Sequence, residues 1–413
     1  MRAQNKTVLV VAALVALMLV CATRSTAQTF SVIHSFTGGG DGFQPYGGVM
    51  IDRAGNLYGT TTQYVRGSVF QMKYHNSGWL LSTLYQFGFG EWLPEGRLTQ
   101  APGGALYGTS TTGGNGFCTE FGCGTVYGLR PPQTICRTVS CPWNANVLSF
   151  TGTDGWQPGV VTPTFDAAGN MYVTTTTGGS SYAGNVIQLT GSGGNWTPNT
   201  IYSFSGPDGS SPYSGVTFDP QGNIYGTTWM GGPNSNGTVY RLTPTNGVWT
   251  LQTLYSFPNS GDGKNPVGAP VMDTAGNLYG TTEYGGSGGG GTVFELSPSG
   301  GGWTVTVLYS FTGQFGPQDT LAMDAAGNLY GTTFTDGAFN HGSIFKLTRN
   351  NGGWTFTDLH DFTSGSDGAN PIGGVTLGPG GVMYGTAAYG GLENDNCPSE
   401  LYPGCGVVWE ITP

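Results

Sequence analysis

The segment Gly55-Asn56-Leu57-Tyr58-Gly59-Thr60-Thr61 decides the fold, because it recurs along the whole chain. Further copies begin at Gly104, Gly169, Gly222, Gly276, Gly327 and Gly381. Each of the seven copies has a tyrosine at its fourth position: Tyr58, Tyr107, Tyr172, Tyr225, Tyr279, Tyr330 and Tyr384. A period of about 55 residues is typical of architectures in which each repeat is one supersecondary unit. The sequence therefore predicts seven structural repeats.

Each repeat has the pattern of four short strands, here called a to d in chain order. In the fourth repeat we expect strand a at 215–219, b at 224–228, c at 238–242 and d at 249–257. Strands a and b are joined by Asp219-Pro220-Gln221-Gly222-Asn223. Asp can accept hydrogen bonds from the backbone of such a turn, and Gly and Asn tolerate positive φ.

The ends of the chain predict how the repeats close on themselves. Strand d ends in phenylalanine in six repeats: Phe87, Phe150, Phe204, Phe257, Phe311 and Phe362. The seventh repeat ends after its strand c, 407–412, but residues 29–36 have the d pattern. An N-terminal strand that completes the last sheet would close a ring without exposed sheet edges. We therefore predict an all-β fold, a seven-bladed β-propeller of four-stranded blades. The alternative, an open β-solenoid, would not need this offset.

The first 27 residues have the pattern of a secretory signal peptide. Arg2 and Lys6 precede the apolar run Val8–Val20, and Ser25-Thr26-Ala27 offers small residues at a cleavage site before Gln28. The run is short for a transmembrane helix. We expect residues 28–413 to form one secreted, extracellular propeller domain. Lipidation at Cys21 is the alternative, which the large Val20 before it disfavours.

Composition limits the partners. The chain has 413 residues, 75 Gly, 24 Pro, only 13 Lys plus Arg, and a net charge of −10. No basic residues cluster, which argues against nucleic acid and an anionic membrane surface as partners. No segment after the leader is long and apolar enough to span a bilayer. We expect a monomer without a cofactor, Ca²⁺ being the one ion considered below.

The repeats resemble the GloVer tandem repeats of secreted bacterial proteins. The matching elements are Gly-Asn-Leu-Tyr-Gly-Thr-Thr, a Gly-Gly loop, Gly-Thr-Val-Phe and Leu-Tyr-Ser-Phe, and they cover nearly the whole chain after residue 27. The resemblance implies export and a repeat fold. It implies no established activity and offers no catalytic residues. Such proteins often carry a C-terminal surface anchor, which is not recognisable here, so we expect a released protein.

The loops between strands b and c and between d and a should share one face of the ring, which is the natural binding surface. The b–c loop has five residues in repeat one (62–66), 13 in repeat two (111–123), 18 in repeat seven (388–405) and eight elsewhere. Two long loops beside a short one would leave a notch over blade one, since insertions often mark a binding face. Neutral variation of surface loops is the simpler interpretation.

Six cysteines follow the leader, an even number that fits an oxidising compartment. Cys118 and Cys123 share the loop of repeat two, Cys397 and Cys405 share that of repeat seven, and Cys136 and Cys141 lie between strands c and d of repeat two. Local pairing is the simplest of the possible connectivities. A zinc site is the alternative, but the spacings do not match a four-cysteine module.

Aromatic and acidic residues in these loops are candidates for ligand binding, because exposed aromatic faces can stack on sugar rings. The candidates are Tyr64, Glu91, Trp92, Trp156, Trp229, Tyr284, Phe334 and Tyr389. Packing between blades would explain the same aromatics. An Asp-Gly pair follows strand d at Asp41, Asp154, Asp208, Asp262 and Asp367. Each carboxylate is a weak candidate Ca²⁺ ligand, and capping of a turn is the alternative.

Function stays open at this stage. We expect a non-catalytic protein that binds an extracellular glycan or cell-surface component through its Gly-rich loops. A carbohydrate-active hydrolase or lyase on the same fold is the second hypothesis, and a structural module of the cell envelope is the third. No nucleophile elbow, metalloprotease motif or phosphate loop occurs. A glycosidase needs only two carboxylates at a set separation, for which Glu91, Glu95 and Glu283 are candidates.

Overall fold

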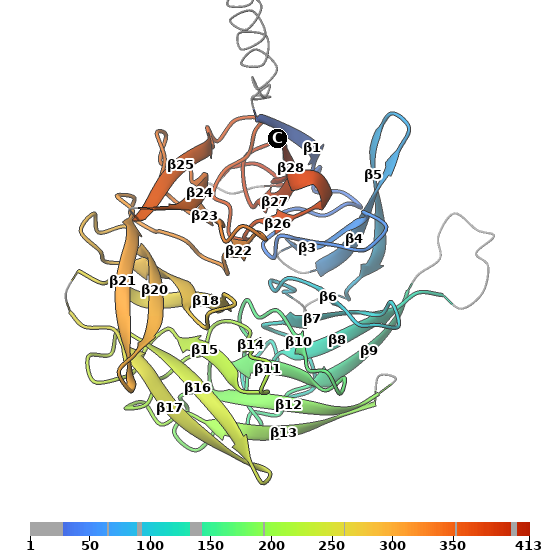
Figure 1. The fold of residues 1–413 in the computed structure, drawn as a ribbon. Helices are drawn as coiled ribbons and strands as arrows, with labels where there is room; N and C mark the ends of the chain where they lie inside the picture. The colour runs from blue at the N-terminus through green and yellow to red at the C-terminus, as the bar shows by residue number, and fades with distance from the viewer. Residues whose placement is uncertain are drawn as a thin grey trace, which may run out of the picture.

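The computed structural model describes residues 28–63, 66–88, 93–132, 143–192, 195–259, 261–351, 353–397 and 403–413. They form seven four-stranded antiparallel sheets. Figure 1 shows the sheets as blades around a central axis, with the first strand of each repeat innermost and the last outermost. The predicted seven-bladed β-propeller is confirmed. The leader, 1–27, lies outside the described residues. In the described part of the chain, no helix is long and apolar enough to cross a membrane.

The first four blades follow one another in sequence. Blade 1 contains β2 (Val49–Ile51), β3 (Leu57–Gln63), β4 (Arg66–His75) and β5 (Gly78–Gln86). Blade 2 contains β6 (Thr99–Gln100), β7 (Leu106–Ser110), β8 (Thr125–Arg130) and β9 (Asn144–Ser149). Blade 3 contains β10 (Thr164–Phe165), β11 (Met171–Thr175), β12 (Asn185–Ser192) and β13 (Asn195–Ser203). Blade 4 contains β14 (Thr217–Phe218), β15 (Ile224–Thr228), β16 (Thr238–Thr245) and β17 (Val248–Ser256).

The last three blades complete the ring. Blade 5 contains β18 (Lys264–Met272), β19 (Leu278–Tyr284), β20 (Thr292–Ser299) and β21 (Gly302–Ser310). Blade 6 contains β22 (Ala322–Met323), β23 (Leu329–Thr333), β24 (Ser343–Asn350) and β25 (Gly353–Asp361). Blade 7 contains β26 (Thr376–Leu377), β27 (Met383–Ala387), β28 (Val407–Thr412) and β1 (Thr29–Ser35), with a short 3₁₀ helix, η1 (Pro379–Gly381), between β26 and β27.

The N-terminal strand closes the ring as predicted. Strand β1 pairs antiparallel with β28, from Thr29 opposite Thr412 to Ser35 opposite Val407, with a bulge between Val32 and His34. The ring of Phe30 stacks on His360 of blade 6, with centroids 3.6 Å apart. Blade 7 therefore holds both ends of the propeller chain and packs against its neighbour through the added strand.

The repeated segment is explained residue by residue. Its second glycine leaves room for an aromatic side chain of strand c: a Cβ at Gly280 would lie 2.5 Å from Cζ of Phe294. Its first threonine reaches the next blade, as in the 3.0 Å hydrogen bond from Thr227 Oγ1 to the Gly268 carbonyl. Its second threonine bonds the start of strand c, as between Thr228 and Thr238 at 2.8 Å. The motif therefore fixes both the sheet and the contact between blades.

The turn between strands a and b is a single hydrogen-bonded unit. In blade 4, Oδ1 of Asp219 accepts the backbone N–H groups of Gln221 and Asn223, and Oδ2 accepts Nδ2 of Asn223 and the hydroxyl of Tyr225. The same pattern occurs at Asp52, Asp166, Asp273 and Asp324. The aspartate thus connects the turn to the tyrosine of the repeated segment.

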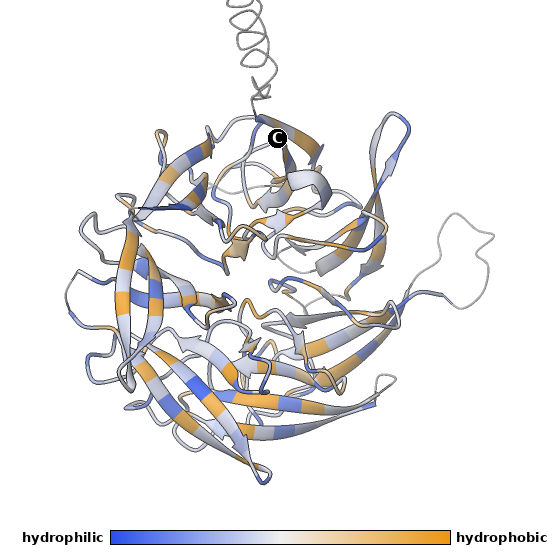
Figure 2. Ribbon diagram, viewed as in Figure 1, coloured by the Kyte–Doolittle hydropathy of each residue, from blue (hydrophilic) through white to orange (hydrophobic). Residues whose placement is uncertain are grey.

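Aromatic side chains pack between blades. The phenylalanine after strand d meets an aromatic residue of the next blade's strand c edge to face, as in Phe257 against Phe294 with ring centroids 5.3 Å apart. Phe204 and Tyr240 do the same at 5.1 Å, and so do Phe87 and Tyr127 at 4.9 Å. These phenylalanines are buried. Figure 2 shows the matching alternation of hydrophobic and hydrophilic residues along the outer strands.

One expectation needs correction. The innermost strand of blade 4 was expected at 215–219 but covers only Thr217–Phe218. The residues before Thr217 do not pair with the next strand, because their carbonyl groups accept hydrogen bonds from neighbouring blades. The Ser214 carbonyl, for example, accepts a 2.6 Å hydrogen bond from Thr174 of blade 3. The short inner strands leave irregular backbone around the axis.

Candidate functional site

In each blade a proline lies before or near the start of the innermost strand, and it restricts the position of the residue that follows it. These prolines are Pro45, Pro94, Pro158, Pro212, Pro266, Pro317 and Pro371. Most of them pack on a glycine at the start of the preceding blade's strand c, so that a Cβ at Gly237 would lie 2.5 Å from Cδ of Pro266. Because Pro also restricts its own φ, the next residue is held in one place in each repeat. That residue varies in type from blade to blade.

Five of these variable residues meet on the axis, namely Tyr46, Glu95, Tyr213, Gln318 and Ile372. They form a cavity of about 270 Å³ together with side chains from the ends of the b strands and the loops after them. The lining residues are Tyr46, Glu95, Val160, Tyr213, Glu283, Phe315, Gln318, Phe334, Ile372 and Tyr389. The cavity is therefore axial, with walls from every side of the ring rather than from blade 1 alone. We call it the axial cavity.

Glu95 is the acidic group of blade 2 in this cavity. It follows Pro94 and is half-buried, with protein atoms packed around its carboxyl group. Burial raises its pKa to about 7, although a hydrogen bond with Thr111 acts in the opposite direction. Near neutral pH the carboxyl group of Glu95 is therefore present in both its protonated and its ionised form.

Glu283 is the acidic group of blade 5, and it lies at the end of β19. Its Oε2 accepts a 2.9 Å hydrogen bond from the indole N–H of Trp229. The neighbouring hydroxyl of Tyr284 also bonds this carboxylate, and burial together with the charge of Glu283 raises the pKa of Tyr284 to about 12. Two hydrogen-bond donors thus hold Glu283 in place, whereas burial is the main influence on Glu95.

Tyr213 links the two acidic groups electrostatically. Burial, then the charge of Glu95, then that of Glu283, raise its pKa to about 12. Both carboxylates therefore act on one phenol within the same cavity. The residue is still 39% exposed, so part of Tyr213 is accessible to a ligand. As a neutral group at physiological pH, this hydroxyl can donate and accept hydrogen bonds.

Other polar groups of the cavity differ in how far they are paired. The hydroxyls of Tyr46 and Tyr389 are 2.5 Å apart and hydrogen-bond each other. Nε2 of Gln318, in contrast, is buried and has no hydrogen-bond partner within the part of the chain that the structure describes. A buried amide donor without a partner is costly, so an acceptor that reached it would gain binding energy. The aromatic wall continues through Phe315 and Phe334, whose rings meet edge to face at 6.0 Å.

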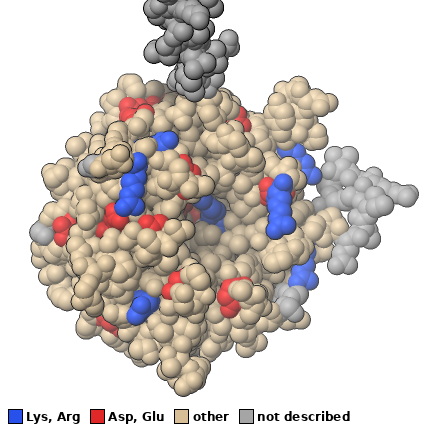
Figure 3. Space-filling view, in the orientation of Figure 1, with Lys and Arg blue, Asp and Glu red and all other residues tan. Residues whose placement is uncertain are grey.

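The layer next to the cavity is crossed by an arginine. Arg97 of blade 2 donates to the Gly374 carbonyl of blade 7 at 2.7 Å and contacts Asp319 of blade 6 at 3.4 Å. It passes Gly48 of blade 1, where a Cβ would lie 3.1 Å from Nη2 of Arg97. Figure 3 shows a hollow at the centre of the ring with a basic group inside it, and only scattered charges elsewhere on that face. Arg97 therefore joins blade 2 to blades 6 and 7.

The structure places the sequence-based candidates in different surroundings. Phe334 and Tyr389 line the axial cavity, and Trp229 and Tyr284 support its wall through Glu283. Trp156 lies elsewhere, in a groove of about 620 Å³ with Phe117 and Tyr182 beside it. Tyr64, Glu91 and Trp92 lie outside the described residues. Sequence reasoning missed Tyr46, Tyr213 and Gln318 as site residues, although their shared position after the proline was a usable signal.

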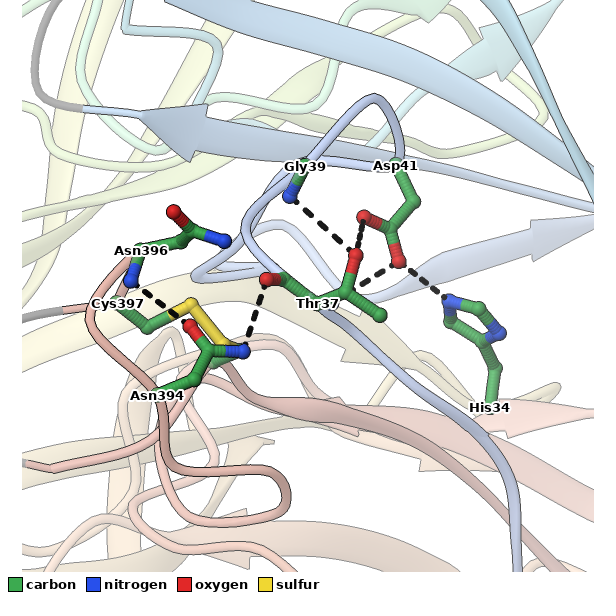
Figure 4. Close-up of a disulfide and its surroundings, with 8 residues drawn as sticks. His34, Thr37, Gly39, Asp41, Asn394, Asn396 and Cys397 are labelled. Carbon is green, nitrogen blue, oxygen red and sulfur yellow. Dashed lines mark hydrogen bonds and ion pairs between the residues drawn. A yellow bond between two sulfur atoms is a disulfide. The ribbon is translucent and has the colours of Figure 1, made fainter.

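The aspartates proposed as weak Ca²⁺ ligands cap their own turns. Asp41 accepts hydrogen bonds from the backbone and hydroxyl of Thr37 and from His34, as Figure 4 shows. Burial would raise the pKa of Asp41, but these bonds lower it overall. Asp154, Asp208 and Asp367 accept equivalent bonds from Thr or Ser, and Asp262 accepts one from Tyr255. Across the described ranges, no three His, Cys, Asp or Glu groups come close enough to hold a metal ion.

Two of the expected disulfides brace the loops of the same face. Cys118 bonds Cys123, and Cys397 bonds Cys405. Cys136 and Cys141 lie outside the described residues. The second disulfide packs against the first loop of the propeller, where a Cβ at Gly38 would lie 2.6 Å from Sγ of Cys397. Asn394 adds a 3.1 Å hydrogen bond to the Thr37 carbonyl (Figure 4). The disulfide loop of blade 7 thus supports the junction with the N-terminal strand.

Comparisons relate the chain to one family and to several solved structures. A family model described as the Gloeobacter/Verrucomicrobia repeat matches residues 159–397. A search of curated proteins gave no match. A Bacteroides uniformis structure provisionally named 6-phosphogluconolactonase is 14% identical with a TM-score of 0.49, covering 94% of this chain and 100% of that one. A protein of unknown function from Dyadobacter fermentans is 12% identical with a TM-score of 0.46, covering 80% and 98%.

Proposed function

The chain belongs to the Gloeobacter/Verrucomicrobia repeat family, and we propose that it binds a neutral sugar unit of an extracellular glycan in the axial cavity. The observation that carries this proposal is the convergence of aromatic faces, two carboxyl groups and an unpaired amide in one cavity on the loop face. Ligand sites are usually concave, mostly apolar, and equipped with a few polar groups that orient the ligand.

The lining of the cavity favours a sugar over other small ligands. Sugar rings have apolar C–H faces that pack on aromatic side chains such as Phe334, and hydroxyl groups that pair with groups such as Gln318 and Tyr213. The volume of about 270 Å³ is near the lower end of the usual range for ligand pockets. It therefore fits one terminal sugar unit better than an internal segment of a polysaccharide.

The charges of the cavity favour a neutral ligand. Glu95 and Glu283 both face the space, and the described residues that line it include no Lys or Arg. Arg97, one layer away, is already paired with Asp319. An acidic sugar or a phosphorylated one would meet repulsion from the two carboxylates. Phosphate esters and uronic acids are therefore poor candidates.

The proposal places the protein outside the cell. The signal-like residues 1–27 and the two disulfides support export, because disulfides persist in oxidising compartments. Residues 28–413 would then be the mature propeller. N-terminal sequencing of protein recovered from the culture medium tests this part, with Gln28 as the expected first residue.

The direct test is a glycan and polysaccharide array with residues 28–413, followed by calorimetric titration of the bound sugars. Tyr213→Ala should weaken binding by at least about tenfold, equivalent to ~1.4 kcal/mol. The matched control is Trp156→Ala, which changes an aromatic residue in a separate groove and should leave the Kd unchanged. The absence of any bound glycan, or loss of binding with Trp156→Ala alone, would contradict the proposal.

A further inference from the structure

We propose, resting on the function just proposed, that the axial cavity hydrolyses the glycoside it binds, with Glu95 as general acid and Glu283 as the base that activates water. Both groups line one cavity, and they come from blades 2 and 5. These blades lie on opposite sides of the axis, as Figure 1 shows. A sugar on the axis would therefore have one carboxyl group on each side, the arrangement used by glycosidases.

The two carboxyl groups have different surroundings in the cavity. Around Glu95, burial is the largest influence and raises the pKa of the carboxyl group to about 7. Around Glu283, the N–H of Trp229 donates to Oε2, so a directional hydrogen bond holds this carboxylate. A buried carboxyl group and a hydrogen-bonded carboxylate in one cavity are the kind of pair from which an acid and a base are assigned.

No other ionisable group in the described lining of the cavity competes with Glu95 and Glu283 for the roles of acid and base. The remaining ionisable side chains in its described lining are Tyr46, Tyr213 and Tyr389, which stay neutral at physiological pH as phenols. The nearby cation, Arg97, is committed to Asp319 and Gly374. Glu95 and Glu283 are therefore the two carboxyl groups of the described lining, which includes no cation.

The proposed reaction conserves atoms and charge. Glu95 gives its proton to the glycosidic oxygen as the bond from that oxygen to the anomeric carbon breaks. Water attacks the anomeric carbon from the opposite face and gives a proton to Glu283. The products are the free sugar and the shortened glycan alcohol, and proton exchange with solvent restores Glu95 and Glu283. Because water attacks directly, the anomeric configuration inverts. The substrate class is a neutral glycoside with its terminal sugar in the cavity.

The hydroxyl of Tyr213 and the amide of Gln318 would position the substrate. Tyr213 lies within reach of the charges of both carboxylates, and Nε2 of Gln318 is a buried donor still without a partner among the described residues. Both groups can hold ring hydroxyls while the acid and base act. Proximity of this kind contributes to the rate only if the sugar is oriented between the two carboxyl groups.

The test measures hydrolysis and binding on the same protein. The substrates are a panel of 4-nitrophenyl glycosides of neutral sugars and whichever glycan the array identifies. We expect Glu95→Gln and Glu283→Gln each to lower kcat by at least about 100-fold, with a much smaller change in Kd. The exposed Glu393, outside the cavity lining, gives the matched control Glu393→Gln, which should leave both quantities unchanged.

The pH dependence and the product provide independent readouts. Since Glu95 must be protonated, kcat/KM of the natural protein should fall above a pH of about 7, and NMR should detect the inverted anomer first. Binding without hydrolysis of any substrate would overturn this inference and leave the proposed function standing. Unchanged kcat in Glu95→Gln, or retention of configuration, would overturn the assigned roles. Absence of binding would overturn both proposals.

Discussion

The indole N–H of Trp229 in the loop after β15 donates a 2.9 Å hydrogen bond to Oε2 of Glu283 in β19. The two residues belong to neighbouring blades, so this bond joins blades 4 and 5 at the wall of the axial cavity. A carboxylate that is held by a directional donor keeps its orientation toward the cavity. Trp229 is therefore a positioning residue, which acts on a ligand through Glu283.

Trp229→Phe keeps an aromatic ring but removes the donor. We expect ligand binding to weaken by roughly tenfold, about 1.4 kcal/mol, because Glu283 loses a hydrogen bond to a charged group. Calorimetric titration with the array-selected glycan measures the effect. The thermal midpoint should change little, since Trp229 is only half-buried. Unchanged affinity with a lower thermal midpoint would show that the bond serves the fold alone.

Deletion of residues 28–36 should unfold blade 7. Strand β1 supplies the outer strand of that blade, and its loss exposes the edge of β28 and the face that packs on His360. We expect the thermal midpoint, followed by circular dichroism, to fall by more than 10 °C, the scale of several kcal/mol in a domain of this size. A control that replaces exposed Thr29 with Ala should melt like the natural protein. An unchanged melt after the deletion would be incompatible with ring closure.

The turn aspartates should be among the polar residues that matter most for stability. Asp324→Ala removes the acceptor of four hydrogen bonds, two from backbone N–H groups, one from Asn328 and one from Tyr330. We expect a loss of about 2–4 kcal/mol in the free energy of unfolding. Tyr330→Phe removes only one of these bonds and should cost about 1 kcal/mol. Urea unfolding measures both, and equal losses would show that the turn is not one unit.

The disulfide of blade 7 should stabilise the junction with the N-terminal strand. Replacing Cys397 and Cys405 by Ser should lower the free energy of unfolding by about 2–3 kcal/mol, as expected for a short closed loop. Hydrogen exchange should increase first at 37–42, because Asn394 and Cys397 contact that loop. The Cys118–Cys123 pair offers the matched control, which should leave exchange at 37–42 unchanged. Equal effects of both pairs on that loop would contradict the contact.

The fold was predictable because each repeat has the same residue types at the positions that fix its strands and turns. The threonine and tyrosine of the repeated segment have equivalent partners in most blades, as Thr227 and Tyr279 show, so their recurrence signals one common geometry. The offset of the N-terminal strand followed from a missing strand in the last repeat. The length of the inner strands was not predictable, because the hydrogen bonds that shorten them come from neighbouring blades, as from Thr174 to Ser214.

The candidate site was less predictable for the opposite reason. A comparison of repeats emphasises what the blades share, whereas the axial cavity is made of what differs after each proline, such as Tyr46, Glu95 and Gln318. Glu95 and Glu283 were recognisable only as separate acidic residues. Their shared cavity depends on the closed ring, which brings residues about 190 positions apart to one axis. Phe334 could be predicted from the sequence because it directly follows a copy of the repeated segment.

The most direct test of a sugar site on the propeller axis is a crystal structure of residues 28–413 with the glycan that binds best on the array. We expect one sugar ring on the axis, with hydroxyl groups bonded to Gln318 and Tyr213, Glu95 on one side and Glu283 on the other. A glycan seated in the groove at Trp156, with the axial cavity free of sugar, would contradict it.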